Sequence, residues 1–246
     1  MERLVIIPTY NESENIEAIV KAVMTLPIDF HVLIIDDGSP DGTADLVKAM
    51  MRKEYNDRLF LIERAGKQGL GTAYICGFRW AIEHRYEYIF EMDADFSHNP
   101  QDLLKLYDAC ANEGADVAIG SRYVSGVNVV NWPMGRVLMS YFASKYVRFV
   151  LGLPVYDTTA GFKCYRRQVL ETIELDKIRF KGYAFQIEMK FTAYKCGFRL
   201  QEVPIIFVNR VLGTSKMSGG IFSEALLGVI RLKWSSFFRK YPQKKV

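Results

Sequence analysis

Two aspartates one residue apart follow the apolar run EYIF. Asp93 and Asp95 stand in the segment FEMDADFSH, residues 90–98. Because alternate side chains of an extended segment share a face, both carboxylates can approach one ligand. A hard divalent cation, Mg²⁺ or Mn²⁺, would offset their repulsion and take its other ligands from water and substrate phosphates. The pair therefore predicts a metal–phosphate site; the alternative is that Asp95 or Ser97 caps a helix beginning near Pro100.

Two further polar clusters follow apolar runs in the same way. PTYNE (8–12) comes after the first run, and DDGSPDGT (36–43) comes after the second. In an open α/β sheet, ligands bind beyond the carboxyl ends of the strands. Asp-Gly-Ser-Pro is also a good turn sequence. Three such clusters in phase, however, favour a ligand site over separate turns.

The elements that would hold these clusters alternate along the chain. Short apolar runs predict strands at 4–8, 31–36, 58–63, 87–92 and 116–121. Helical spacing of apolar residues predicts helices at 16–24, 42–53, 70–84 and 100–113. After residue 122 we expect a helix over 136–151, more helix, and a strand over 200–208 that extends the same sheet. The expected fold class is α/β, with a mostly parallel central sheet flanked by helices.

The glycine-rich segment GKQGLGTA (66–73) is a second possible phosphate signal. Its glycines are spaced GxxGxG rather than GxGxxG, and it follows the third strand run rather than the first. No GxxxxGK[ST] loop is present. These features argue against a dehydrogenase and a P-loop enzyme, and favour a segment that shapes a nucleotide pocket or a tight strand-to-helix turn.

Composition excludes several classes of protein. The chain has 246 residues, a net charge of +4 and four widely spaced cysteines, which we interpret as reduced core residues of a cytosolic protein. We find no signal-peptide h-region and no run of about 18 apolar residues, so no membrane span is expected. Of the histidines, His31 and His84 lie in ordinary contexts, and His98 is expected to be a turn residue rather than a ligand.

Eight motifs occur in an order that resembles glycosyltransferase family 2, which has the GT-A fold. The match covers residue 3 to about 220, and the motifs read PTYNE, DDGSPDGT, GLGTAY, MDADFSH, GSRY, DTTAGFK, KGYAFQIEM and EVPIIFVNR. Together with the R-x-x-G-x-S-K run at 210–216, they resemble more closely the transferases that pass mannose to dolichyl or polyprenyl phosphate. The resemblance implies one GT-A (Rossmann-like) domain over residues 1–220.

The resemblance also implies a role for each candidate site residue. The base and ribose of the donor would be held by Pro8, Tyr10, Glu12 and Asp37. The metal would be held by Asp93 and Asp95, and the donor would also touch Ala94. Donor phosphates or the transferred phosphate would be contacted by Arg122, Arg210 and Lys216. The acceptor phosphate would be contacted by Arg136 and Ser140. The catalytic set is then Asp93, Asp95, Arg122 and Arg136, with Asp157 and Glu188 as candidates either for the acceptor side or for pairing with Lys163 or an arginine. Some relatives carry Gln where this chain has Ser97, so a third protein ligand is not expected.

The predicted helix over 136–151 carries two stripes. One is polar and consists of Arg136, Ser140, Ser144 and Arg148. The other is apolar and consists of Val137, Leu138, Tyr141, Phe142, Phe149 and Val150. Pattern alone favours an ordinary amphipathic surface helix, whereas the resemblance favours a helix that meets a lipid with a phosphate head.

The implied reaction moves mannose from GDP-mannose to a polyprenyl (dolichyl) monophosphate, with inversion and with Mg²⁺ or Mn²⁺. The alternatives are transfer of glucose or another sugar from a UDP donor, and a non-catalytic protein that binds nucleotide sugars. A nucleic-acid partner is not expected, because RNA-type aromatic platforms and a basic fold surface are missing.

The last segment, 221–246, is amphipathic and basic. From Ala225 onward it holds six Lys or Arg and no acidic residue. We expect it to lie in the interface on the cytoplasmic face of a membrane, where Trp234 and two phenylalanines suit the interface and the cations suit anionic lipid. A docking helix for a small membrane subunit or for a second protomer remains the alternative.

Overall fold

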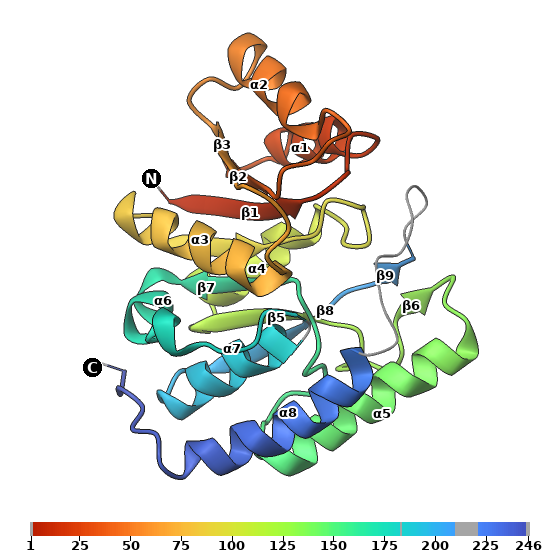
Figure 1. The fold of residues 1–246 in the computed structure, drawn as a ribbon, viewed down its shortest axis with the longest axis vertical. Helices are drawn as coiled ribbons and strands as arrows, with labels where there is room; N and C mark the ends of the chain where they lie inside the picture. Colours follow the sequence, from red (N-terminus) through yellow and green to blue (C-terminus); the bar gives the residue numbers. More distant parts are fainter. Residues whose placement is uncertain (1, 183, 210–220, 245–246) are drawn as a thin grey trace.

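The computed structural model describes residues 2–182, 184–209 and 221–244, with side chains described only from 227 onward in the last range. Within these ranges a seven-stranded sheet forms the centre of the molecule, in the order β3-β2-β1-β4-β7-β5-β8 (Figure 1). The strands are β1 Arg3–Thr9, β2 His31–Asp36, β3 Leu59–Glu63, β4 Tyr88–Glu91, β5 Val117–Ser121, β7 Lys163–Arg166 and β8 Leu200–Pro204. A separate two-stranded sheet joins β6 Val129–Val130 to β9 Phe207–Val208.

The sheet is mostly parallel, as the sequence predicted. Strand β1 pairs in parallel with β2 and β4, β2 pairs with β3, and β5 pairs with β8. The exception is β7, which runs antiparallel between β4 and β5. Sequence reasoning missed β7, because KCYR is short and half of it is charged. Since β7, β5 and β8 all join the central sheet, the prediction that the second half extends the same sheet is confirmed.

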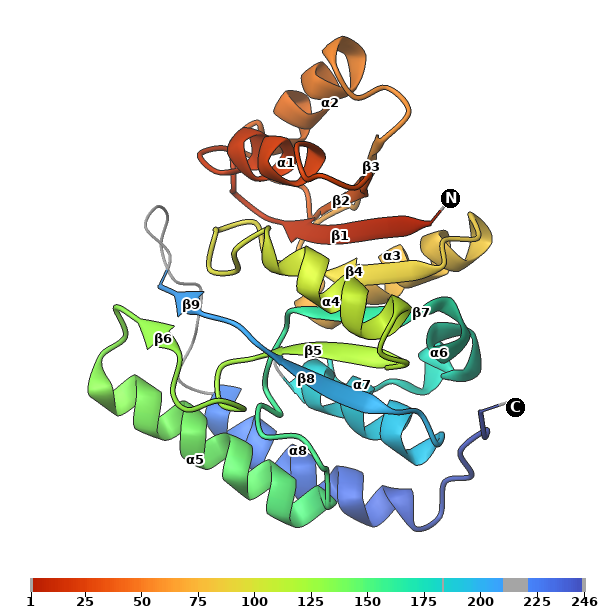
Figure 2. The same cartoon turned by 180° about the vertical axis from the view of Figure 1, so that it is seen from behind.

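Helices cover both faces of the sheet (Figures 1 and 2). They are α1 Ile16–Met24, α2 Thr43–Lys53, α3 Leu70–Glu83, α4 Asp102–Ala111, α5 Met134–Leu151, α6 Arg167–Thr172, α7 Ala184–Lys195 and α8 Ile221–Ser236, with a 3₁₀ turn, η1, at Leu175–Lys177. Core side chains of α1, α2 and α4 gather on one face of the sheet, and those of α3, α6 and α7 gather on the other. Helices α5 and α8 lie side by side below α7 and share a smaller apolar cluster with it.

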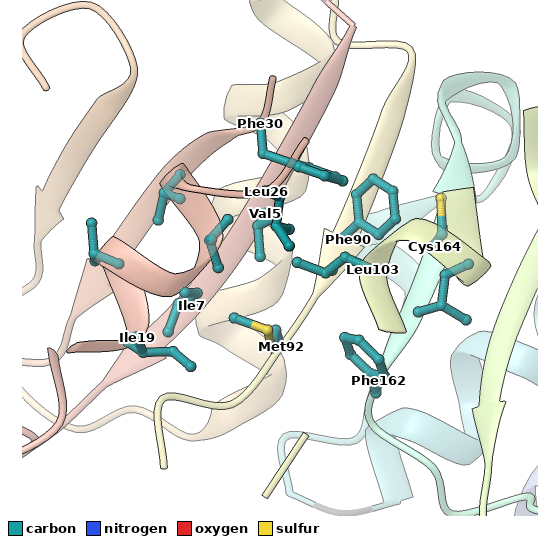
Figure 3. Close-up of a cluster of buried hydrophobic side chains, with 14 of the residues drawn as sticks. Val5, Ile7, Ile19, Leu26, Phe30, Phe90, Met92, Leu103, Phe162 and Cys164 are labelled. Carbon is teal, nitrogen blue, oxygen red and sulfur yellow. The ribbon is translucent and has the colours of Figure 1, made fainter. Parts of the chain in front are cut away.

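The core explains why the first strand is an unbroken apolar run. Val5 and Ile7 point into the cluster beneath α1 and α4, whereas Leu4 and Ile6 point into the opposite cluster. All four side chains are fully buried. Figure 3 shows the first cluster, where Phe90 lies near Phe30 and Leu103. A strand covered on both faces has no polar side, so its sequence reads as continuous rather than alternating.

The predicted strand over 200–208 is wrong as a single element. It breaks after Pro204 into β8 and β9, and β9 leaves the central sheet to pair with β6. Proline lacks the N–H that would continue the ladder, which accounts for the end of β8 at this residue.

The four cysteines are free, and three of them are buried, as expected. Cys76 is only half-buried, so the prediction of a core position is wrong there. No helix in the described ranges has both the length and the apolar character needed to cross a membrane.

Candidate functional site

The carboxyl ends of β1 and β2 are joined by polar side chains. The Thr9 hydroxyl donates to Asp36 Oδ1 at 2.9 Å, and the Asp37 amide donates to the Thr9 carbonyl at 3.0 Å. The Asp37 carboxylate is buried and accepts from Arg64 at 2.6 Å. Pro8 stands opposite Ile35 in the adjacent strand. Arg64, a partner that the sequence pattern did not indicate, therefore fixes Asp37 in place. Asp37 lies at the edge of the sheet where the nucleotide is predicted to bind.

The PTYNE and DDGSPDGT clusters bind each other through backbone amides. The amide of Glu12 donates to Thr43 Oγ1 at 3.1 Å, and the amide of Ser13 donates to Asp41 Oδ2 at 3.0 Å. The Thr43 hydroxyl donates to Asp41 Oδ1 at 2.6 Å. Partial burial favours the neutral acid at Asp41, but these hydrogen bonds prevail and lower its pKa to about 2. The two predicted donor-binding clusters therefore form one fixed unit.

The glycine-rich segment forms the tight turn before α3. Gly69 has a φ of +101°, and a Cβ there would come within 3.0 Å of the Lys181 carbonyl, so the position requires glycine. Lys67 from this turn places its Nζ 5.3 Å from the centre of the Tyr10 ring. The turn thus brings a cation to a residue that the resemblance assigned to the nucleotide.

Asp93 and Asp95 lie on the loop that follows β4. The Asp93 side chain is 42% exposed, whereas Asp95 and Ala94 are buried. Asp95 Oδ1 accepts the amide N–H of Ser97 at 3.0 Å, a local turn contact five residues or more before α4 begins. Phe96 between them has a φ of +56°, a region that L-residues rarely adopt. Asp95 is therefore held within a strained turn, and neither Asp95 nor Ser97 caps α4.

This pair is chemically suited to a hard cation. No cluster of three or more His, Cys, Asp or Glu suitable for a metal occurs among the residues that the structure describes. Two carboxylates leave most of an octahedral shell to water and to oxygens of the substrate. That division is the usual one for Mg²⁺ in sites that bind phosphate groups.

The side chain of His98 packs next to the aspartates. It lies in the bend after Asp95, as expected, but it is also buried. Its Nδ1 is 3.9 Å from Asp93 Oδ2, and its ring stacks on Phe162 with centroids 4.8 Å apart and meets Phe207 edge-on. Burial lowers the pKa of His98 to about 4, so its ring is neutral at physiological pH.

Arg122 is bound tightly by Asp157. Its Nε and Nη2 donate to the two carboxylate oxygens at 2.7 and 2.6 Å, and Nη2 also donates to Thr159 at 2.8 Å. Burial alone would lower the pKa of Arg122 and raise that of Asp157, but their pairing reverses both shifts, so both stay charged. Of the two roles open to Asp157, the structure places it against an arginine. Nη1 of Arg122 takes no part in these bonds.

A tryptophan joins Arg122 to Arg136. The Trp132 ring centre is 5.5 Å from the Arg122 guanidinium and 4.1 Å from that of Arg136. Arg136 Nη1 donates to Asn209 at 3.2 Å, and Ser140 lies one turn later on α5. The amide of Val208 in β9 donates to the Ser97 carbonyl at 3.2 Å, which ties this group to the aspartate loop. The structure therefore brings together four of the predicted residues, Asp93, Asp95, Arg122 and Arg136. Arg210 and Lys216 lie outside the described residues.

Comparison with known proteins identifies the family. Residues 4–174 match the family described as "Glycosyl transferase family 2". The chain belongs to that family. It is 49% identical over 226 residues to polyprenol monophosphomannose synthase of Mycolicibacterium smegmatis, covering 92% of this chain and 84% of that one. It is 46% identical over 231 residues to undecaprenyl-phosphate mannosyltransferase of Micrococcus luteus, covering 94% and 93%. The predicted family and the prediction of a glycosyltransferase are confirmed.

Solved structures of other glycosyltransferases share the fold. Glucosyl-3-phosphoglycerate synthase from Mycobacterium tuberculosis, in complex with Mn²⁺ and UDP, has a TM-score of 0.67 and 17% identity, over 95% of this chain and 79% of that one. A mannosyltransferase from Pyrobaculum calidifontis, in complex with GDP-Man and Mn²⁺, has a TM-score of 0.61 and 18% identity, over 98% and 66%. The predicted α/β fold with a mostly parallel sheet is confirmed.

A buried polar layer underlies the site of this glycosyltransferase. Glu91 and Lys163 are fully buried, with Oε2 and Nζ 3.0 Å apart, and Gln186 bonds to both. Lys190 is also fully buried and donates to the Ala160 carbonyl at 2.6 Å. Burial lowers the pKa of both lysines, and for Lys163 the charge of Glu91 opposes that shift. Glu91 is the last residue of β4 and precedes Asp93 by two residues, so this layer supports the strand that leads into the aspartate loop.

Glu188, the other acceptor-side candidate, does not join this layer. Its Oε2 accepts the amides of Arg179 and Phe180, each at 2.9 Å. It therefore anchors the loop that precedes α7.

Helix α5 exposes half of its predicted apolar stripe in this glycosyltransferase: Leu138, Phe142 and Phe149 are exposed, whereas Val137, Tyr141 and Val150 are partly buried. Ser144, from the predicted polar stripe, is only 1% exposed, whereas Phe149 is 89% exposed. The neighbouring α8 exposes three apolar residues at helical spacing, and two more are exposed in the turn that directly follows it. We call this set the α5–α8 surface: Met134, Leu138, Phe142, Phe149, Leu227, Ile230, Trp234, Phe237 and Phe238. So many large exposed apolar side chains on two adjacent helices are typical of an interaction surface.

Sequence reasoning missed Arg64, Lys67, Trp132 and Asn209. Arg64 and Lys67 directly follow the third strand, at the same sheet edge as the aspartates, so their position was an available signal. Trp132 and Asn209 depend on the pairing of β6 with β9, and such short strands leave no periodic pattern.

Proposed function

We propose that this chain transfers mannose from GDP-mannose to a polyprenyl monophosphate. The observation that carries the proposal is the meeting of the aspartate loop with Arg122 and Arg136 around Trp132. Two carboxylates for a metal–diphosphate and two guanidinium groups for phosphates suit a donor and an acceptor that both carry phosphate. The names of the two relatives at 49% and 46% identity support this choice of sugar and acceptor class.

In the proposed complex, Asp93 and Asp95 would hold Mg²⁺ or Mn²⁺. When bound, the cation would neutralise charge on the leaving diphosphate. The base and ribose lie against Pro8, Tyr10, Glu12 and Asp37, and Ala94 touches the donor. Phosphate oxygens meet Arg122, Arg210 and Lys216 on the donor side and Arg136 and Ser140 on the acceptor side.

The reaction is a direct displacement. An oxygen of the acceptor phosphate forms a bond to C1 of mannose, while the bond from C1 to the β-phosphate oxygen breaks and GDP leaves. The configuration at C1 inverts. A phosphate monoester has a second pKa of about 6, so the acceptor is already ionised at neutral pH. A general base is therefore not required.

The α5–α8 surface would rest on the membrane that holds the lipid acceptor, on its cytoplasmic face. Residues 1–220 would act as the transferase domain and 221–246 as the interfacial segment. The exposed side chains of α5 extend this surface beyond the C-terminal segment, and α5 begins at Met134, two residues after Trp132. A lipid lying along α5 could thus present its phosphate to Arg136, in the first turn of that helix.

The test is a transfer assay with purified protein, detergent-dispersed polyprenyl phosphate and Mg²⁺ or Mn²⁺. GDP-mannose and UDP-glucose are compared in parallel. We expect mannolipid from GDP-mannose, and a fall of about 10²- to 10³-fold in rate for Asp95→Asn, the size seen when one electrostatic contact to the transition state is lost. Asp45→Asn, at an exposed position on α2, is the matched control and should keep full activity.

Glucolipid from UDP-glucose would move the protein to a sibling activity with the same mechanism. Binding of nucleotide sugar without any product, under both metals, would contradict the proposal and favour a non-catalytic binding protein.

A further inference from the structure

A pocket lies away from the aspartate loop and from Arg122 and Arg136. It has a volume of about 830 Å³ and opens between η1, the loop before α7, and the C-terminal part of α8. None of the residues assigned above to the donor, the metal or the acceptor phosphate lines it, although Glu188, a candidate for the acceptor side, does. Helices α7 and α8, which both contribute residues to the pocket, pack against each other and lie next to each other in Figure 1. Three arginines line it: Arg179, Arg231 and Arg239.

The acidic residues of this pocket are already engaged. Asp176 forms an ion pair with Arg79, and the Glu188 carboxylate accepts the two amides of the loop before α7. Within the described residues, no ion pair to a carboxylate is formed by Arg179, Arg231 or Arg239. The pocket therefore offers an excess of guanidinium groups.

Arg239 is the most informative of the three. Its Nη1 donates to the Lys177 carbonyl at 3.4 Å, and its guanidinium lies 5.1 Å from the centre of the Tyr241 ring. Its Nε and Nη2 are buried and have no hydrogen-bond partner in the described part of the chain. A buried N–H without a partner is costly. Two adjacent guanidinium donors match two oxygens of a phosphate group.

The residues of the C-terminal segment beside the pocket indicate which class of anion it would bind. Leu227, Arg231 and Trp234 follow one another at spacings of four and three residues, so they lie on one side of α8, and Phe238 follows in the turn after the helix. Phe238 lines the pocket and is 78% exposed, and Trp234 is 70% exposed. If these aromatic residues lie at the level of lipid headgroups, the arginines beside them lie at the level of lipid phosphates.

We propose that this pocket binds the phosphodiester headgroup of an anionic phospholipid and so docks the enzyme on the membrane. The inference rests on the membrane placement given under the proposed function. Its ligand is a bulk lipid of the bilayer, distinct from the polyprenyl phosphate that is consumed in the reaction.

The test compares binding to vesicles of phosphatidylcholine alone with binding to vesicles that also contain phosphatidylglycerol. The pocket variant is Arg231→Gln/Arg239→Gln. The matched control is Lys233→Gln/Lys240→Gln, which removes two cations from the same segment but none that lines the pocket. We expect the phosphatidylglycerol-dependent affinity of the pocket variant to fall by about fivefold or more for each cation. We expect a smaller fall for the control. Equal losses in both variants would mean that the charge acts through a diffuse field, and would overturn the proposal.

A second arm distinguishes a lipid headgroup from free phosphate. Short-chain phosphatidylglycerol below its micelle concentration and inorganic phosphate are titrated while the arginine side-chain NMR signals are followed. Saturable shifts of the Arg239 Nε–H signal with the lipid, and weaker ones with phosphate, are expected. Phosphate binding as tight as the lipid, or no shift with either, would overturn the assignment.

The transfer assay in detergent separates this inference from the proposed function. The pocket variant should retain wild-type transfer there, because none of its changes touches the site around the aspartates. Normal transfer without selective lipid binding would overturn the pocket proposal alone. Selective lipid binding by a protein without transfer activity would overturn the proposed function alone.

Discussion

The edge of the sheet that carries the candidate site and the α5–α8 surface are built in opposite ways. At the sheet edge, charged groups such as Asp37 and Arg122 are buried and bound to partners within the chain. On the α5–α8 surface, large apolar side chains such as Phe149 and Trp234 are exposed. One region removes charge from water, and the other leaves apolar area in water.

The difference indicates what each region is made to meet. Paired and hydrogen-bonded charges keep their geometry before a ligand arrives, which suits a site for phosphate groups and a metal. Exposed apolar area costs free energy until something covers it. Changes in the first region should therefore alter the stability of the fold, whereas changes in the second should alter association and leave stability unchanged.

The largest effect is expected from Lys163→Met, beneath the aspartate loop. Removing the ammonium leaves Glu91 as a buried carboxylate without its ion-pair partner. Such a loss costs about 3–5 kcal/mol in the free energy of unfolding, measured by urea denaturation. The double variant Glu91→Gln/Lys163→Met removes both charges and should recover part of that loss. A cost below about 1 kcal/mol for the single variant would show that the layer is not a structural ion pair.

The α5–α8 surface should respond in the reverse manner. Phe149→Ser/Trp234→Ser removes one exposed aromatic side chain from each helix. We expect the free energy of unfolding to change by less than about 0.5 kcal/mol. Binding to phosphatidylcholine vesicles should weaken by about 150-fold or more, because each large apolar side chain contributes about 1.5–3 kcal/mol when fully covered and about 1.4 kcal/mol corresponds to a tenfold change in affinity.

The control for this prediction is Tyr194→Ser/Ile206→Ser. It also removes two exposed apolar side chains, but neither lies on α5 or α8. This variant should bind vesicles as the wild type does. Equal weakening in both double variants would remove the distinction between the α5–α8 surface and the rest of the exterior.

The sequence predicted the two regions unequally well, for a physical reason. The first strands are buried on both faces, and their unbroken apolar runs marked them clearly. Strand β7 was missed because its Lys163 is buried only by pairing with Glu91, far away in the chain. On α5, periodicity identified two stripes but could not tell which one faces the protein. The buried stripe proved to include the polar residue Ser144.

In the candidate site, too, features that depend on local sequence order were predicted better than features that depend on long-range contacts. Motif positions placed Asp93 and Asp95 on the loop after a strand, because that depends on local order along the chain. The partner of Asp37, Arg64, was missed, and Asp157 was expected to pair with an arginine without indication of which one; the fold shows that it is Arg122. Sequence order thus located the groups, whereas their pairing needed the structure.

Two glycines, one packed against the central sheet and one on α5, allow the two regions to be compared by adding a single methyl group to each. Gly77 lies in α3 against β1, and a Cβ there would stand 2.7 Å from Ile6 Cγ2, which belongs to a fully buried and branched side chain. Gly77→Ala should therefore lower the free energy of unfolding by about 1–3 kcal/mol. Gly135, exposed near the start of α5, has no atom within 4 Å of such a Cβ.

Gly135→Ala should be neutral or raise the free energy of unfolding by up to about 1 kcal/mol, through helix propensity. Thermal and urea denaturation of the two variants side by side would measure the contrast. If both alanines lowered stability to the same extent, tight packing at the sheet would not be the cause.

The smallest expected effect is the pH dependence contributed by Asp41 at the sheet edge. Its pKa of about 2 lies below the ordinary value of 3.8, because hydrogen bonds from Thr43 and Ser13 outweigh the opposing effect of burial. The folded state thus binds fewer protons than the unfolded state between these values. The stabilisation is therefore fully present above the ordinary value and is lost as the pH falls through the folded one. The difference in unfolding free energy between the wild type and Asp41→Asn should be constant above about pH 5 and shrink toward pH 2.

Thr43→Val, which removes the hydroxyl donor, should shift the Asp41 carboxyl titration, followed by NMR, toward the ordinary value. A wild-type titration already near that value would mean that the two donor-binding clusters are not joined through this carboxylate.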